Sequence, residues 1–301
     1  MSLDLLEWSE QLLADTAPLL RTQRLGRAAR ALGGTTSTML DAAEWLAAGA
    51  PDGALVVAAT QSIGRGRLGR AWHDHAGASL LCSVVLRPGL PAGLTGLIPL
   101  AAGVAGAMAI ERATGLAPAL KWPNDIVVLG ESGDSAVHRL SDWESHHSSP
   151  SIPSSNSIPR PLSTLSPAKL AGVLAEARAG AVVVGMGMNV GRDAVPDDPA
   201  VAATSLEAEC EGPVAPAPVL AAYLDALEDL LDSLAVDAGA RVRNEWEARM
   251  HARGEAVTAG GVAGIALGIA PDGALRLTTD AGESLVYAGD VAPANAPVGA
   301  G

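Results

Sequence analysis

Apolar residues along the chain form two kinds of pattern, short continuous runs and runs with helical spacing. A continuous run of four to eight apolar residues bounded by turn residues is typical of a buried strand. Such runs predict strands at 55–59, 79–86, 120–129 (as two pieces), 169–176 and 181–184. Apolar residues three and four positions apart predict helices instead. These helices cover 2–32 (one or two short ones), 39–48, 94–114, 219–234 and 241–253.

The order of these elements indicates the fold class. Consecutive strands are separated by too few residues for crossover helices, which favours antiparallel neighbours over βαβ units. From residue 254 onward, four short strand-like pieces lie between glycine turns, so the tail is predicted to be a compact all-β unit. The predicted class is α+β, with a mixed, largely antiparallel sheet and flanking helices over 1–253 and a small β unit over 254–301.

One segment departs from both patterns. Residues 130–167 contain 12 serines and 5 prolines in 38 positions and have little periodicity. A segment this polar cannot bury enough apolar surface to offset the entropy lost on ordering. We therefore predict a disordered surface insertion, in which His138, His146 and His147 are surface residues rather than metal ligands.

Composition and charge exclude several classes of protein. The 301 residues include 20 Lys and Arg against 33 Asp and Glu, a net charge of −13 that disfavours a general nucleic-acid-binding surface. The longest apolar run, residues 97–110, is 14 residues and too short to span a bilayer. The first residues lack the features of a signal peptide. Cys82 and Cys210 lack the spacing of a disulfide framework or zinc site. A cytoplasmic protein without membrane or nucleic-acid partners is predicted.

The basic residues are unevenly distributed, because 18 of the 20 are arginine and the two lysines are Lys121 and Lys169. A lysine presents a compact ammonium on a flexible stem, whereas an arginine presents a planar fork. In a chain that uses arginine almost everywhere else, two retained lysines indicate positions that require the ammonium. The alternative is that both lysines are retained by chance.

The segment 61–72 combines three glycines at the spacing G-x-G-x-x-G with three arginines: Gly64, Gly66, Gly69, Arg65, Arg67 and Arg70. A dinucleotide-binding loop would have to open a helix, but the residues after Trp72 do not read as one. Glycines free the backbone to fold around a ligand, and guanidiniums bind carboxylate or phosphate oxygens. The pattern fits a loop that orders over an anionic ligand; a solvated basic loop is the alternative.

The segment Lys121-Trp122-Pro123-Asn124-Asp125 interrupts a predicted strand pair. Asn124 and Asp125 would present oxygens at a strand end, an arrangement suited to Mg²⁺ held together with phosphates. The alternative is an Asx-turn that buries Trp122 in the core.

Two further segments lie at strand ends. Lys169 begins a strand beside Gly172 and the small residues around it, where its ammonium could enter a narrow pocket and stabilise charge at phosphorus. Gly185 and Gly187 permit flat contact with a ligand, and Asn189 offers an amide to phosphate or metal. Glycines of this kind also occur at strand bulges.

Taken together, the segments resemble biotin protein ligase, the enzyme family that attaches biotin to biotin-dependent carboxylases. The resemblance rests on five segments in the family's order: Thr35-Thr36-Ser37, Gln61 with Gly64 to Trp72, Lys121 to Asp125, Lys169 to Gly172, and Gly185 to Asn189. It covers about residues 28 to 290 apart from the insertion. It implies a biotin/lipoate ligase-like catalytic domain over 1–253 and a small SH3-like β-barrel over 254–301.

The resemblance implies a ligase that uses biotin, ATP and Mg²⁺. Biotin would be activated as biotinyl-5′-AMP with release of pyrophosphate, and then transferred to a lysine of a biotin carboxyl carrier domain, the expected protein partner. The resemblance leaves a homodimer through a sheet edge open.

The resemblance also implies roles for individual residues. The catalytic residues would be Lys169, Arg65 and Arg67. Biotin would be bound by Thr35, Thr36, Ser37, Gln61, Gly64, Arg65, Gly66, Arg67, Lys169, Gly172, Gly185 and Gly187. ATP or the adenylate would be bound by Arg67, Arg70, Trp72, Lys121, Asn124 and Asn189, with Trp72 against the adenine. The metal would be held by Asn124 and Asp125.

This sequence departs from the family pattern at three points. Ser37 stands where the family usually has Asn, which puts that biotin contact in doubt. The insertion replaces a connection of a few residues. The residues before the first family segment are too few for the N-terminal DNA-binding domain that some members carry, so no repressor role is expected.

Two other functions share some of these sequence features. A lipoate ligase shares the fold and the adenylation chemistry, but the Gly-Arg-Gly-Arg loop and the Lys-Trp-Pro-Asn-Asp segment favour biotin. A non-catalytic protein that binds biotin or docks a carrier is disfavoured by Lys121, Lys169 and the three loop arginines.

The insertion generates the first testable prediction. We expect deletion of residues 132–166 to leave adenylation intact, because a hairpin extension on the surface contributes nothing to the core. Pyrophosphate release by the shortened protein, compared with the full chain, measures this. A large loss of adenylation in a protein that still folds would show that the segment takes part in activity.

Overall fold

A seven-stranded mixed sheet forms the centre of the computed structural model, which describes residues 4–130, 166–178, 180–195 and 202–294. The strand order is β1–β2–β5–β9–β8–β7–β6. Only the β1–β2 pair is parallel within this sheet, so the expected largely antiparallel arrangement is confirmed. The strands are β1 (Ala29–Thr35), β2 (Leu55–Gln61), β5 (Ser79–Leu86), β9 (Ala181–Asn189), β8 (Ser166–Arg178), β7 (Asp125–Gly130) and β6 (Ala119–Lys121).

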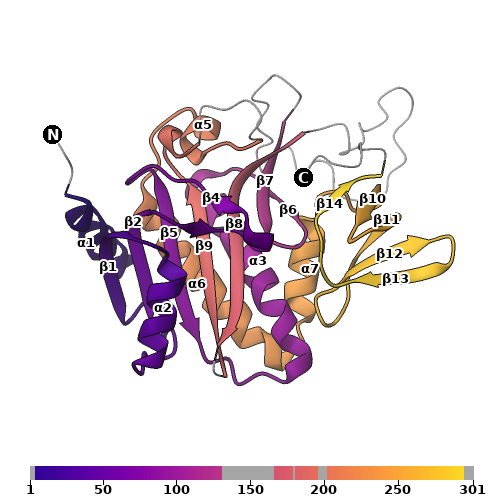
Figure 1. Cartoon of the computed structure of the whole chain (residues 1–301), viewed down its shortest axis with the longest axis horizontal. Helices are drawn as coiled ribbons and strands as arrows, with labels where there is room; N and C mark the ends of the chain where they lie inside the picture. Colours follow the sequence, from indigo (N-terminus) through magenta and orange to yellow (C-terminus); the bar gives the residue numbers. More distant parts are fainter. Residues whose placement is uncertain (1–3, 131–165, 179, 196–201, 295–301) are drawn as a thin grey trace.

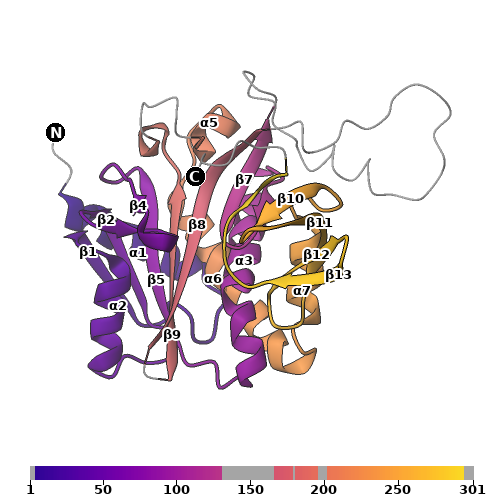
Figure 2. The same cartoon turned by 45° about the vertical axis from the view of Figure 1, so that its right-hand side comes forward.

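Helices cover both faces of the sheet because its strands are apolar on both sides. Along β2, Leu55 and Val57 face the larger core with helices α3 and α6, whereas Val56 faces a smaller core with α2. Figures 1 and 2 show the helices in these layers. The helices are α1 (Leu5–Thr16), α2 (Thr38–Ala47), α3 (Ile98–Thr114), α5 (Leu206–Cys210), α6 (Pro216–Val236) and α7 (Ala240–Ala248).

The C-terminal residues form a separate antiparallel sheet beside the β6 end of the large sheet, far from β1 (Figure 1). Its order is β13–β12–β11–β10–β14, so the predicted all-β tail is confirmed, with five strands where four were expected. Within residues 254–294 the sheet is open and no barrel closes. The strands are β10 (Ala256–Ala259), β11 (Val262–Ile269), β12 (Leu275–Thr279), β13 (Gly282–Val286) and β14 (Val291–Pro293).

The two sheets share one apolar core, in which Val257, Leu275 and Leu277 join the residues around α3 and α6. The Trp122 indole Nε1 also donates a hydrogen bond to the carbonyl oxygen of Gly273, at 3.3 Å. The division into 1–253 and 254–301 stays a prediction, although β10 begins close to it at Ala256.

The N-terminal prediction was wrong in one part. The helical spacing predicts helix through residue 32, but residues 29–32 belong to β1, which pairs in parallel with β2. The segment Ala29–Thr35 is rich in small residues and lacks the alternation that marks a strand, so its structure is set by pairing with β2.

Helix α3 is confirmed, with Gly115 as a left-handed cap at φ 73°. In the part of the chain that is described, the stretch Gly93–Thr114 is long and apolar enough to cross a bilayer. However, 67% of its most apolar window is buried inside the protein, as expected of a central core helix.

The predicted insertion joins two neighbouring strands. Residues 131–165 lie outside the described residues, but the positions on either side are described. Gly130 at the end of β7 pairs with Ser166 at the start of β8. Because the two ends lie opposite each other in an antiparallel pair, the connection takes the place of a hairpin turn.

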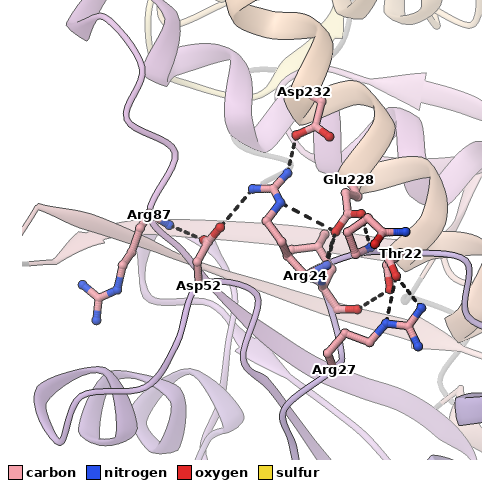
Figure 3. A network of polar contacts seen from close by, with 9 residues as sticks. Thr22, Arg24, Arg27, Asp52, Arg87, Glu228 and Asp232 are labelled. Carbon is pink, nitrogen blue, oxygen red and sulfur yellow. Dashed lines mark hydrogen bonds and ion pairs between the residues drawn. The ribbon is translucent and has the colours of Figure 1, made fainter.

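A polar network fastens the segment before β1 to helix α6 (Figure 3). The Glu228 carboxylate accepts hydrogen bonds from the backbone N–H groups of Gln23, Arg24 and Leu25, at 2.5, 2.9 and 2.9 Å. Burial acts to raise the pKa of Glu228, but the three N–H donors and Arg24 together outweigh it, and the pKa is lowered. Arg24 also pairs with Asp52, at 2.9 Å, and with Asp232.

Replacement of Glu228 by Gln tests this network. The amide replaces one of the two carboxylate oxygens with an NH₂ group, which cannot accept from a backbone N–H group. The free energy of unfolding should therefore fall by about 1–3 kcal/mol at pH 7. A lowered folded pKa gives stability above the unfolded pKa, about 4.3, that is lost as pH falls through the folded pKa. The difference between variant and wild type should therefore shrink below about pH 4, measured by urea denaturation.

Asp229→Asn is the matched control, because its exposed side chain on the same helix pairs only with Arg241 among the described residues. An exposed pair contributes about 0–1 kcal/mol. Equal effects of the two substitutions would contradict the role given to Glu228.

Candidate functional site

The floor of the site is a patch of sheet without side chains. Gly172 of β8 lies opposite Gly187 of β9 in the register, and Gly185 lies opposite Ser83 of β5. A Cβ at Gly187 would lie 2.6 Å from Cε2 of Trp72. A Cβ at Gly185 would lie 2.5 Å from Sδ of Met39. The glycines thus allow side chains to lie directly on the backbone of the sheet, on the face that carries α2.

A narrow cavity of about 40 Å³, the first cavity, lies over this floor. Many residues predicted from sequence line it: Ser37, Gln61, Arg65, Gly66, Trp72, Asn124, Lys169, Gly172, Gly185 and Gly187. Sequence reasoning missed other lining residues: Thr38, Met39, Cys82, Val173, Leu174 and Met186. Segments far apart in the chain therefore meet at one site.

The rim near α2 is organised by hydroxyl groups. Thr38 donates to Gln61 Oε1 from its backbone N, at 2.8 Å, and from its hydroxyl, at 3.2 Å. Ser83 in turn donates to the Thr38 hydroxyl, at 2.9 Å. The Gln61 carbonyl is thereby fixed. The run of hydroxyls from 35 to 38 pointed to this rim, but it did not indicate which of them reach the cavity.

Two of the predicted hydroxyl residues do not line the cavity. Thr35 donates its hydroxyl to Asp41, at 2.5 Å, and accepts a hydrogen bond from the Ser37 backbone N. Thr36 is exposed. Ser37 is buried and lines the cavity, so of the predicted triplet it alone reaches the first cavity.

Lys169 stands at one wall of the first cavity. Its Nζ lies 2.7 Å from Oδ1 of Asp125 and 5.5 Å from the centre of the Trp72 ring. The pairing of β7 with β8 shifts by one residue beside Lys169: Ile126 pairs with Ala171, and the next residue, Val127, pairs with Lys169. The ammonium is thus held between a carboxylate and an aromatic face, both of which favour a cation.

The residues predicted to hold a metal have other partners. Asp125 pairs with Lys169, and the Asn124 amide nitrogen donates to the Val173 carbonyl, at 2.9 Å. Among the described residues, no group of three or more His, Cys, Asp or Glu side chains could hold a metal ion. The Asn124 side-chain oxygen and part of the Asp125 carboxylate could add ligands to a Mg²⁺ that arrives bound to phosphates, but they do not form a resident site.

The Asn189 side chain forms hydrogen bonds with backbone carbonyl groups. Its side chain is buried and donates hydrogen bonds to the carbonyl oxygens of Thr204, at 3.0 Å, and Lys169, at 3.4 Å. It does not line the first cavity. Asn189 therefore fixes the position of Thr204 beside Lys169, and its predicted role toward nucleotide or metal stays a prediction.

The segment from Gly64 to Trp72, the arginine loop, folds into a small hairpin. Strand β3 (Gly64–Arg65) pairs with β4 (Ala71–Trp72), and the short 3₁₀ turn Arg67–Gly69 connects them. This confirms that no helix follows the glycines, so the dinucleotide-binding interpretation fails. Arg65 and Arg67 point to different cavities, because Arg65 lines the first and Arg67 a second.

This second cavity of about 310 Å³ lies between the large sheet and the C-terminal sheet. Arg67, Trp122 and Asn124 line it from one side, and Asp272 and Tyr287 from the other. It shares Asn124, Val173 and Leu174 with the first cavity, so the two cavities are neighbours.

The remaining candidates lie beside these cavities. Arg70 pairs with Asp290 of the C-terminal sheet, at 2.7 Å. Lys121 lines neither cavity and lies near His251, whose pKa is lowered to about 4 by burial and by the charge of Lys121. Burial also raises the pKa of Cys82 to about 12, so its thiol stays protonated and is no nucleophile.

Comparisons with known proteins place the chain among ligases. Residues 32–193 match the model of the biotin/lipoate A/B protein ligase family. The bifunctional ligase/repressor BirA of Bacillus spizizenii is 30% identical over 262 residues, which cover 85% of this chain and 71% of that protein. The biotin–[acetyl-CoA-carboxylase] ligase of Mycobacterium tuberculosis is 32% identical over 161 residues, covering 52% and 47%.

The fold is also similar to solved structures. The biotin protein ligase from Aquifex aeolicus in complex with biotin and ATP has a TM-score of 0.67 and 23% sequence identity, covering 88% of this chain and 98% of that one. At this identity the likeness concerns the fold, which is the mixed sheet with flanking helices that the sequence predicts. On the match over more than half of its length, the chain belongs to the biotin/lipoate A/B protein ligase family.

Proposed function

We propose that this chain is an ATP-dependent biotin protein ligase of the cytoplasm, which activates biotin as biotinyl-5′-AMP and transfers it to a lysine of a biotin carboxyl carrier domain. The observation that carries the proposal is the meeting of Gln61, Arg65 and Lys169 around one glycine-floored cavity. A fixed amide and two cations that line one cavity suit a ligand that carries both a neutral polar group and an anionic group. Relatives named as biotin ligases support the choice of ligand.

In the first half-reaction, the biotin carboxylate attacks the α-phosphorus of MgATP and pyrophosphate leaves. Two anions must approach each other, and negative charge builds up on the phosphoryl oxygens. Arg65 and Lys169 line the cavity where these groups would meet, and Arg67 lines the neighbouring one. Their charges would offset the repulsion and stabilise the transition state. Mg²⁺ enters this scheme as part of the MgATP substrate.

In the second half-reaction, the carrier lysine amine attacks the acyl carbon of biotinyl-5′-AMP. The C–O bond to the phosphate breaks, AMP leaves and an amide forms. The mixed anhydride must be shielded from water until the carrier arrives. We assign this shielding to the arginine loop, whose Arg65 lines the first cavity and whose Arg67 lines the second.

Ligand entry requires the Trp72 side chain, at the end of the arginine loop, to move. The first cavity, about 40 Å³, is far smaller than the roughly 300–1,000 Å³ of a typical ligand pocket. The Trp72 ring takes up the space over Gly187 and Gly172. We therefore propose that Trp72 leaves the glycine floor when biotin binds and then lies against the adenine of the adenylate.

Pyrophosphate release from MgATP by the purified protein tests the proposal, with biotin compared against lipoate. Biotin-dependent release, followed by label on an added carrier domain, is the expected result. Release with lipoate alone would assign the chain to lipoate activation, which the family also includes. Biotin binding without pyrophosphate release would show a binding protein.

Lys169→Ala should lower the rate of adenylation by about 10²–10³-fold, because it removes a charge that faces the reacting phosphate. Lys169→Arg should fail to restore the rate, since a guanidinium fits neither the position nor the Asp125 partner in the same way. Arg178→Ala, which removes an exposed charge from the far end of β8, is the matched control. Near-normal turnover of Lys169→Ala would exclude Lys169 from the mechanism.

Gly187→Ala should abolish or strongly weaken biotin binding while the protein still folds. The added Cβ would lie 2.6–3.0 Å from three atoms of the Trp72 ring. Because the methyl group fills the space directly above the backbone, neither the ring nor biotin could lie flat on the floor. Isothermal titration with biotin measures the loss. Gly93→Ala, where a Cβ meets nothing within 4 Å, should bind like the wild type. Unchanged affinity in Gly187→Ala would show that the ligand does not use this floor.

A further inference from the structure

The arginine loop is fastened to the C-terminal sheet at a single carboxylate. Asp290 Oδ2 lies 2.7 Å from Nη2 of Arg70, and Asp290 Oδ1 lies 3.7 Å from Nη1 of Arg67. Arg67 Nη1 also donates a hydrogen bond to the carbonyl oxygen of Gly289, at 3.3 Å. Two neighbouring guanidiniums thus share one anion that lies more than 200 residues away in the sequence.

The segment that carries Asp290 is held firmly. Gly289 has a φ of 122°, and a Cβ there would lie 2.6 Å from the backbone nitrogen of Gly260. Asp290 directly precedes β14, where Val291 is buried and pairs with Ala259 of β10. Asp290 is therefore presented from a fixed strand end.

Two backbone hydrogen bonds within the arginine loop close its turn. The Gly66 N–H donates to the Arg70 carbonyl, at 2.7 Å, and the Arg70 N–H donates to the Arg67 carbonyl, at 3.2 Å. A two-residue strand pair and a 3₁₀ turn give such a loop little stability by themselves. Its position over the cavities thus depends on contacts with the rest of the protein. Among these contacts, the ion pairs with Asp290 hold both Arg67 and Arg70.

The charges explain why one carboxylate can hold both side chains. Arg67 and Arg70 repel each other, and partial burial of Arg67 makes its charge more costly. That burial lowers the pKa of Arg67, whereas Asp290 acts to raise it. The side chains of Arg70 and Asp290 are about half exposed, so water screens part of their attraction. Asp290 therefore restricts where the two arginines lie more than it adds to overall stability.

We propose that Asp290 is a positioning residue for adenylation: through it the C-terminal sheet holds Arg67 and Arg70 at the second cavity, ready to receive the phosphates of ATP. This inference rests on the proposed function. The same sheet also supplies Asp272 and Tyr287 to that cavity and accepts the Trp122 hydrogen bond at Gly273. The C-terminal sheet thus forms one wall of the nucleotide site and fixes the loop opposite.

Asp290→Asn tests the proposal by its separate effects on the two substrates. The KM for ATP should rise about tenfold, because the arginines lose their fixed starting positions and must be ordered on binding. The KM for biotin should change little, since Arg65 and Gln61 do not contact Asp290. Asp290→Glu, which keeps the carboxylate, should restore most of the ATP affinity. Asp280→Asn removes the same charge from the β12–β13 turn of this sheet and should behave like the wild type.

A lower KM for ATP in Asp290→Asn would overturn the proposal, because it would mean that Asp290 competes with the phosphates. Equal KM values in Asp290→Asn and Asp280→Asn would overturn it as well. Thermal unfolding of each variant shows whether a change in KM comes from loss of the fold.

Trypsin supplies a readout that does not depend on activity. It cleaves after Arg65, Arg67 and Arg70, and mass spectrometry identifies the cut sites. In ligand-free protein, Asp290→Asn should be cut in this loop several-fold faster than the wild type or Asp280→Asn, because local opening exposes the chain. Faster cutting of Asp290→Asn, together with a wild type that releases no pyrophosphate in the presence of biotin, would support the contact between Asp290 and the loop but reject the ligase function. Unchanged cutting would reject the positioning role itself.

Discussion

The pairing of glycine with glycine across β8 and β9 is the constraint on which the site depends. Where Gly172 lies opposite Gly187, the sheet has no side chains on its α2 face, and a flat group can lie against its backbone. Elsewhere on this face Val56, Val85 and Val183 fill the space under α2. The site thus exists because a covered sheet is left bare over a few positions in one register.

The charged residues of the site depend on the same register. Asp125 of β7 pairs with Gly172, and this places its carboxylate beside Lys169. A slip of one residue would turn Lys169 to the opposite face of the sheet. Because β7 and β8 are joined across the long insertion, the many backbone bonds of β8 with β9 have to keep this register. One strand alignment therefore determines both the apolar core on the face that carries α3 and α6 and the glycine floor on the face that carries α2.

The sequence predicted the strands and helices that bury long apolar runs, including β5, α3 and α6, because burial on this scale leaves a clear pattern. It could not predict β1, whose small residues carry no alternation and which depends on pairing with β2. It indicated most residues of the first cavity through their motifs. It could not show that Asn189 would bond to backbone carbonyls, or that Thr35 would bond to Asp41, since both depend on segments brought together by folding. The contact between Asp290 and the arginine loop left no local signal at all.

The placement of the two lysines has a chemical consequence for the proposed function, in which the protein makes an acylating agent. An acyl adenylate reacts with any accessible primary amine. Lys169 is tied to Asp125, and Lys121 is half-buried at the end of β6. All other basic side chains besides histidine are arginines, whose guanidiniums are far poorer nucleophiles. The protein's own surface therefore offers few side-chain amines to the proposed adenylate, which would favour transfer of biotin to a carrier over labelling of the protein itself.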